Sequence, residues 1–229
     1  MYCRTRVLLA PSKAGSIDAT QRELKMNMTE VSVVGVIVAK LVGLWWYFRL
    51  MKQGKVDPAL STWIILTIIT GLSLWTYSNA EHNDFRAGIL NTVDVFSNFS
   101  VVLALLFLSK HGVRFKKLEQ WYLVGIASII GYGLVTGSAW GANVMTQLLL
   151  VGAYVPTLYK IFTNKKSSDS YMQFGMGIVC ALFALYPAFI SEGNTLSSIY
   201  VWRSMLSCLV VMLLMGYYDL KQWRKNRVR

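Results

Sequence analysis

Apolar stretches of helix length follow one another along nearly the whole chain, and short polar segments separate them. We place seven such stretches, at 31–51, 60–79, 87–108, 118–136, 140–162, 171–190 and 197–219. Each is close to the length of about 20 residues that an α-helix needs to cross the hydrocarbon core of a bilayer. The pattern predicts an all-α integral membrane protein with seven transmembrane helices, surrounded by a lipid bilayer.

The composition supports this prediction and removes one rival. The chain has 229 residues, of which 55% are hydrophobic and only 15% are charged, whereas soluble domains carry about 25% charged residues. A net charge of +12 would suggest nucleic-acid binding if the charge formed one patch. The basic residues are instead divided among alternate loops, so we expect no nucleic-acid partner.

The charge of the loops predicts the orientation of the helices. Most Lys and Arg residues lie in the first, third and fifth loops and in the C-terminal tail, within 49–55, 110–117, 160–166 and 221–229. The opposite loops carry Arg86 beside the acids Glu81, Asp84 and Glu192. Because cytoplasmic loops are enriched in Lys and Arg, we predict an outside N-terminus and a cytoplasmic C-terminus, in a plasma or inner membrane.

The N-terminal segment, residues 1–29, departs from this charge rule. It places several basic residues on the predicted outer side, and it has no apolar core long enough for a signal peptide. We expect a disordered leader there. Whether residues 1–25 belong to the mature protein stays open.

An internal repeat divides the rest of the chain. The segments 45–55 and 156–166 each precede an apolar stretch, and their alignment pairs Phe48 with Tyr159. Helices one to three and five to seven then form two similar triplets, and the single helix between them makes both triplets face the membrane in the same direction. This predicts a 3+1+3 arrangement of parallel repeats. The first repeat covers 30–110, the linker helix 111–138, the second repeat 139–220 and a basic cytoplasmic tail 221–229.

The stretch GAYVPTLYKIFTNKKSSDS, residues 152–170, resembles a helix end and loop of the SWEET sugar transporters. That family belongs to the wider PQ-loop superfamily, and Pro156-Thr157 stands here in place of Pro-Gln. The resemblance implies a 3+1+3 fold, transport by alternating access and self-association into a homo-oligomer. Of the prolines that SWEETs place near the inner ends of four helices, this chain keeps Pro156, and Trp45 occupies the helix-one position.

The resemblance also indicates candidate substrate-binding residues. SWEETs place an Asn in each of helices three and seven and aromatic residues on helices two and six around the sugar. The corresponding residues here are Asn98, Ser207, Trp75 and Tyr186. The aromatic rings would stack on the solute and the polar groups would hydrogen-bond it. The alternative for the two aromatics is helix packing or an interfacial belt.

Pro156 lies inside the fifth predicted helix. Proline lacks the N–H that would bond the carbonyl of Gly152, and its ring clashes with the preceding turn, so the helix should bend there. In a transporter such a bend serves as a hinge. A static kink remains the alternative.

Three ionisable residues lie within predicted helices: Lys40, Asp94 and Arg203. Each costs about 2.5–3.5 kcal/mol at a helix centre, so each needs a partner or water. Asp94 and Arg203 are counterparts in the two repeats, and we expect an ion pair between them that is either an outer gate or a fixed structural pair. Lys40 lies near the middle of the first helix, where it either binds an anionic group of the substrate or extends toward an interface.

These observations favour a transporter, a uniporter or a proton-coupled one, that moves a small polar solute, such as a sugar, by alternating access. A water-filled chamber around Asn98, Lys40, Asp94 and Arg203 would support this prediction, and a packed midplane would oppose it. The alternatives are a heptahelical receptor or scaffold that does not transport, and a vitamin-precursor carrier of the PnuC type. The sequence holds no enzyme signature, so we expect neither catalysis nor a cofactor or metal.

Overall fold

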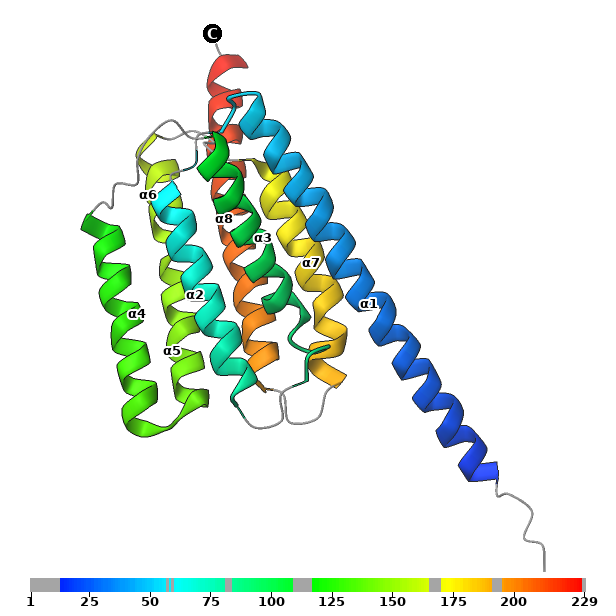
Figure 1. The fold of residues 1–229 in the computed structure, drawn as a ribbon. Helices are drawn as coiled ribbons and strands as arrows, with labels where there is room; N and C mark the ends of the chain where they lie inside the picture. The colour runs from blue at the N-terminus through cyan, green and yellow to red at the C-terminus, as the bar shows by residue number, and fades with distance from the viewer. Residues whose placement is uncertain are drawn as a thin grey trace, which may run out of the picture.

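The computed structural model describes residues 13–56, 58, 60–80, 84–108, 117–164, 170–190 and 195–227. Every regular element within these ranges is an α-helix. The helices are α1 (Lys13–Lys52), α2 (Leu60–Ser78), α3 (Ile89–Leu108), α4 (Lys117–Thr136), α5 (Ala139–Gly152), α6 (Val155–Asn164), α7 (Tyr171–Ile190) and α8 (Thr195–Arg227). They form an up-and-down bundle in which α1 starts at one end and α8 finishes at the other (Figure 1).

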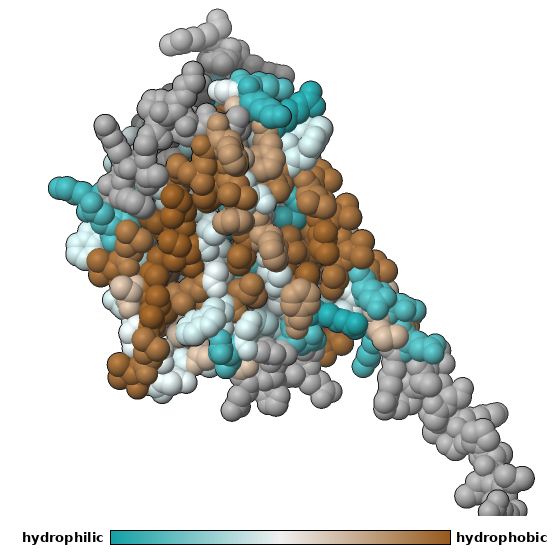
Figure 2. Space-filling view, in the orientation of Figure 1, coloured by the Kyte–Doolittle hydropathy of each residue, from teal (hydrophilic) through white to brown (hydrophobic). Residues whose placement is uncertain are grey.

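Six helical segments in the described part of the chain are long and apolar enough to cross a membrane. They are Glu23–Lys52, Leu60–Ser78, Ile89–Phe107, Ala139–Thr163, Tyr171–Ile190 and Thr195–Arg224. In Figure 2 apolar residues form a broad band across the visible face of the bundle, and hydrophilic residues gather near its ends. The prediction of a helical chain that can span a membrane is therefore confirmed. Its orientation stays a prediction.

The predicted linker helix differs from the other predicted spans. α4 has 20 residues, but it is not among the six membrane-length segments of the described chain. It lies at an edge of the bundle, where it packs on α5 and α2 (Figure 1). Buried Glu119 in its first turn accepts hydrogen bonds from Ser61 at 2.9 Å and Thr62 at 2.7 Å, which fixes α4 to the start of α2.

The first helix begins earlier than expected. α1 starts at Lys13 and has 40 residues, so the expected disorder over 1–29 is wrong from Lys13 onward. The segment 13–30 contains no proline and many good helix formers, and a helix that is already nucleated extends at little cost. At 1.5 Å per residue α1 is about 60 Å long, and its first turns project beyond the bundle (Figure 1).

The helices α1 and α7 pack through small residues. A side-chain Cβ at Gly35 would lie 2.6 Å from Cδ1 of the Phe183 ring, and one at Gly43 would lie 3.2 Å from Cβ of Met176. Buried Ala39 stands between these glycines, and spacing of four residues places all three on one face of α1. Small residues at such intervals let two membrane helices approach closely.

The helix predicted at 140–162 is interrupted close to the predicted place. α5 ends at Gly152, Ala153 and Tyr154 form a turn, and α6 begins at Val155. The Tyr154 N–H donates to the Val151 carbonyl at 3.1 Å, a bond that spans three residues, as in a 3₁₀ turn, instead of the four of an α-helix. Because Pro156 is the second residue of α6, its missing N–H would have been the donor to Gly152. The break is therefore explained by the sequence.

The remaining helix contacts fall within two groups and between them. α3 packs against both α1 and α2, and α8 packs against α5, α6 and α7. Between these groups α1 contacts α7, α2 contacts α5, and α3 contacts both α8 and α7. The contacts of α3 with α1 and with α8 bring Lys40 and Tyr200 to Asp94.

Candidate functional site

One carboxylate joins three helices inside the bundle. Lys40 Nζ on α1 donates to Asp94 Oδ1 on α3 at 2.5 Å, and the Tyr200 hydroxyl on α8 donates to Asp94 Oδ2 at 2.7 Å. The Lys40 and Asp94 side chains are only 25% and 14% exposed, and Tyr200 is buried. Lys40 therefore bonds within the bundle and does not extend toward an interface.

Arg203 lies one turn after Tyr200 on α8. Its guanidinium carbon is 4.5 Å from the centroid of the Tyr200 ring, and its Nε is buried without a hydrogen-bond partner. The predicted Asp94–Arg203 ion pair is thus wrong, because the pair is Lys40–Asp94. Packing of α3 on α1 brings Lys40 to one carboxylate oxygen, and Tyr200 occupies the other.

We call Lys40, Asp94, Tyr200 and Arg203 the charged cluster. Asp94 and Tyr200 each lie in the second turn of their helices, which start at the same end of the bundle (Figure 1). Both helices belong to segments long and apolar enough to span a membrane. The charged cluster therefore lies within these membrane-length segments, toward the end of the bundle where α3 and α8 begin.

Of the residues expected to bind the substrate, Lys40 belongs to the charged cluster, and no hydrogen bond among the described residues joins Asn98, Trp75, Tyr186 or Ser207 to it. Asn98 Nδ2 donates to Thr70 Oγ1 at 3.3 Å, which ties α3 to α2. Trp75 is 55% exposed, because the face of α2 that carries Ser73 and Thr76 is the one packed inside. Tyr186 and Ser207 are half-buried on α7 and α8.

A buried polar network between α2, α3 and α5 was not predicted from the sequence. The Ser73 hydroxyl accepts from Asn91 Nδ2 at 3.0 Å and Gln147 Nε2 at 2.9 Å, and Asn143 Nδ2 donates to the Thr76 hydroxyl at 2.9 Å. The amide oxygens of Asn91 and Gln147 are buried without a partner. Three amides inside apolar stretches were the available signal, because such groups usually face a partner helix.

The middle of the bundle is packed where α8 meets the helix break. The Tyr154 hydroxyl contacts the Cys208 sulfur at 4.0 Å. On the α7 side, a Cβ at Gly177 would lie 2.9 Å from the same sulfur. Cys208 is therefore enclosed between α7 and the turn that separates α5 from α6.

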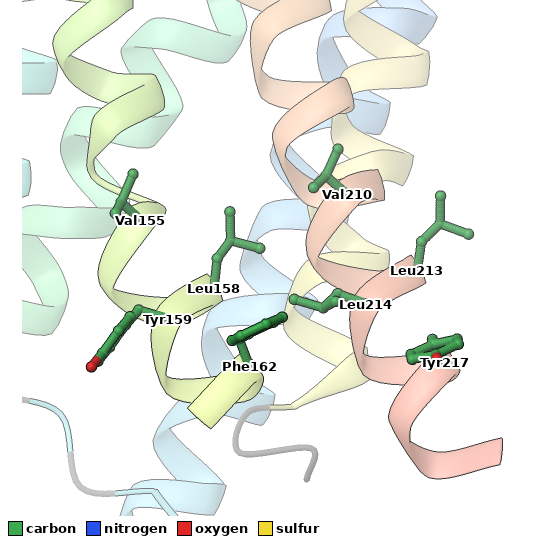
Figure 3. A pocket seen from close by; sticks show the side chains of 8 residues that line it. All are labelled: Val155, Leu158, Tyr159, Phe162, Val210, Leu213, Leu214 and Tyr217. Atoms are coloured by element: carbon green, nitrogen blue, oxygen red, sulfur yellow. The ribbon is translucent and has the colours of Figure 1, made fainter. Parts of the chain in front are cut away.

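Two cavities adjoin these elements, and neither suits a polar solute. A groove of about 660 Å³ between α6 and α8 is lined by apolar and aromatic side chains (Figure 3): Val155, Leu158, Tyr159, Phe162, Val210, Leu213, Leu214 and Tyr217. A second cavity of about 10 Å³, near the minimum that holds one water molecule, lies beside Asn91, Asn143 and Tyr200. Neither of these two, within the described residues, is the chamber that transport requires in its open states.

No family model, curated protein or solved structure matches this chain.

Proposed function

We propose that the chain is a membrane transporter that moves a small polar solute by alternating access. Its two parallel triplets would be α1–α3 and α5–α8, with α5 and α6 as one interrupted helix and α4 as the linker. The helix contacts support this division, because exchanging the triplets converts the α1–α7 contact into the α5–α2 contact. Parallel repeats around a central axis are an architecture of known transporters.

The charged cluster is the observation that carries the proposal. Ionisable side chains inside membrane segments are costly, and they usually mark a substrate or ion pathway. Here the Lys40–Asp94 ion pair lies within the first triplet, and the Asp94–Tyr200 hydrogen bond crosses to the second. The cluster thus joins the two bodies that would move relative to each other.

The described conformation is closed, and opening would separate α3 from α8. The Asp94–Tyr200 hydrogen bond must break in that step, so it would act as the gate, one of the two roles that the sequence left open for an Asp94–Arg203 pair. The interruption before Pro156 would let α6 move apart from α5. Such a hinge opens the bundle at its other end.

The alternative function is a heptahelical receptor or scaffold that does not transport. The packed surroundings of Cys208 and the absence of a chamber from the two cavities favour it. A flux assay separates the two functions. We would reconstitute the wild-type protein into proteoliposomes and screen sugars, amino acids, carboxylates and vitamins for saturable uptake. Saturable uptake of any solute supports transport, and its absence for every solute supports the receptor or scaffold.

A further inference from the structure

The charged cluster holds an unequal number of positive and negative groups. Asp94 is its one acid, and Lys40 already pairs with Asp94 Oδ1 while Tyr200 occupies Oδ2. The guanidinium of Arg203 adds a second cation. The cluster therefore carries one positive charge that no described acid balances.

The surroundings of Arg203 satisfy its hydrogen-bond donors incompletely. Its guanidinium lies over the Tyr200 ring, and its Nε is buried without a hydrogen-bond partner. A ring face attracts a cation, but it does not replace an acceptor for each of the five N–H donors of an arginine. An unpaired cation at membrane depth is costly, so the site is chemically incomplete as it stands.

A planar guanidinium matches one kind of ligand best. Carboxylates and phosphates accept two parallel N–H bonds from an arginine and supply the missing negative charge. A neutral sugar offers hydroxyl groups but no charge. Lys40 is not available for the same task, because its ammonium already bonds Asp94.

From this geometry we infer that the transported solute is an organic anion whose carboxylate or phosphate group binds Arg203. That this anion is transported rests on the proposed function, but the binding of an anion at Arg203 is testable without any flux measurement. Anion binding would complete the cluster with two cations and two anions. It would also place the bound group beside Tyr200, the hydrogen bond of which holds the two triplets together.

The test is a binding measurement on the full chain in nanodiscs of phosphatidylcholine, a lipid without net charge. Thermal unfolding would be followed by the fluorescence of the 8 tryptophans. The probes are acetate, lactate, benzoate and methyl phosphate, each beside a neutral counterpart: acetamide, lactamide, benzamide and trimethyl phosphate. The carboxylate and phosphate probes distinguish the two anion classes, and the neutral lipid excludes a headgroup as the source of the effect.

The decisive variant is Arg203→Gln, and its matched control is Arg49→Gln. Arg49 also lies over aromatic rings, at 5.7 Å from the Trp45 centroid and 5.8 Å from the Trp46 centroid, but at the far end of α1. We expect at least one anion to raise the Tm of the wild type and of Arg49→Gln by several degrees. The affinity of that anion should fall at least tenfold in Arg203→Gln, and its neutral counterpart should have no effect.

Three results would overturn the inference: no shift with any anion, an equal shift with the neutral counterpart, or an anion shift that survives in Arg203→Gln. If that variant does not fold, Arg203→Lys serves in its place, because it keeps the charge but lacks the planar fork and should weaken binding. Uptake of neutral solutes alone would sustain transport and reject the anion. Anion binding without any uptake would sustain the anion site and reject transport.

Discussion

Replacing Tyr200 with phenylalanine should open the bundle. The substitution removes only the hydroxyl that donates to Asp94 Oδ2 at 2.7 Å, and it keeps the ring beneath Arg203. Asp94 retains its ion pair with Lys40. The change therefore weakens the contact between α3 and α8 while the packing of α8 stays nearly the same.

The size of the effect follows from the kind of bond removed. A hydrogen bond to a charged group contributes about 1.5–3 kcal/mol, and each 1.4 kcal/mol changes an equilibrium constant about tenfold. If opening breaks this bond in the wild type, the open population in Tyr200→Phe rises by roughly 10- to 150-fold.

Cys208 supplies a native reporter of opening. Its thiol is buried against Tyr154 in the closed bundle, so a water-soluble thiol reagent reacts with it only when the bundle opens. When reclosing is faster than the reaction, the labelling rate tracks the open population. All variants carry Cys3→Ser, because Cys3 lies outside the described residues, and mass spectrometry of the peptides separates Cys208 from Cys180.

Tyr171→Phe is the matched control for this experiment. It removes a Tyr–Asp hydrogen bond of similar length, 2.6 Å from the Tyr171 hydroxyl to Asp219 Oδ2, but between α7 and α8, which belong to one proposed triplet. We expect Cys208 labelling to rise in Tyr200→Phe and to stay near the wild-type rate in Tyr171→Phe. Equal rates in the two variants would refute the assignment of the Asp94–Tyr200 bond as the gate.

Two further predictions concern stability. Gly35→Ala places a Cβ 2.6 Å from the Phe183 ring, whereas Gly71→Ala meets nothing within 4 Å. Overpacking costs about 1–3 kcal/mol and alanine gains up to about 1 kcal/mol over glycine in a helix, so the Gly35 variant should unfold at a lower Tm than the Gly71 variant. Equal Tm values would exclude the tight α1–α7 contact. Lys40→Met leaves Asp94 with a buried unpaired charge and should lower the free energy of unfolding by about 3 kcal/mol, the low end of the range for broken buried pairs. Adding Asp94→Asn should restore most of this loss, and losses that add up in denaturant unfolding would contradict the ion pair.

The helix positions were largely readable from the sequence, because apolar length alone decides them. The predicted spans 60–79 and 171–190 nearly coincide with α2 and α7. The break before Pro156 was also predictable, since the missing N–H of a proline acts locally. The start of α1 was not predicted, because a polar segment of good helix formers gives no signal that it continues the helix that follows it.

The partner of Asp94 could not be predicted, because it depends on which helix packs against α3. Aligning the repeats singled out Arg203, and the spatial neighbour is Lys40. The network around Ser73 was missed for a similar reason: its members are uncharged, and each alone fits an apolar helix. Only the packing of α2 on α3 and α5 brings them together.

Solute flux across a membrane tests the central proposal most directly. The wild-type chain and Arg203→Gln would be reconstituted into phosphatidylcholine proteoliposomes, and uptake of the small anions and neutral solutes would be followed over a range of concentrations. The proposal predicts saturable uptake of at least one organic anion by the wild type and a loss of at least tenfold in Arg203→Gln. Saturable binding of these solutes without uptake of any would contradict it and would assign the chain to the receptors or scaffolds.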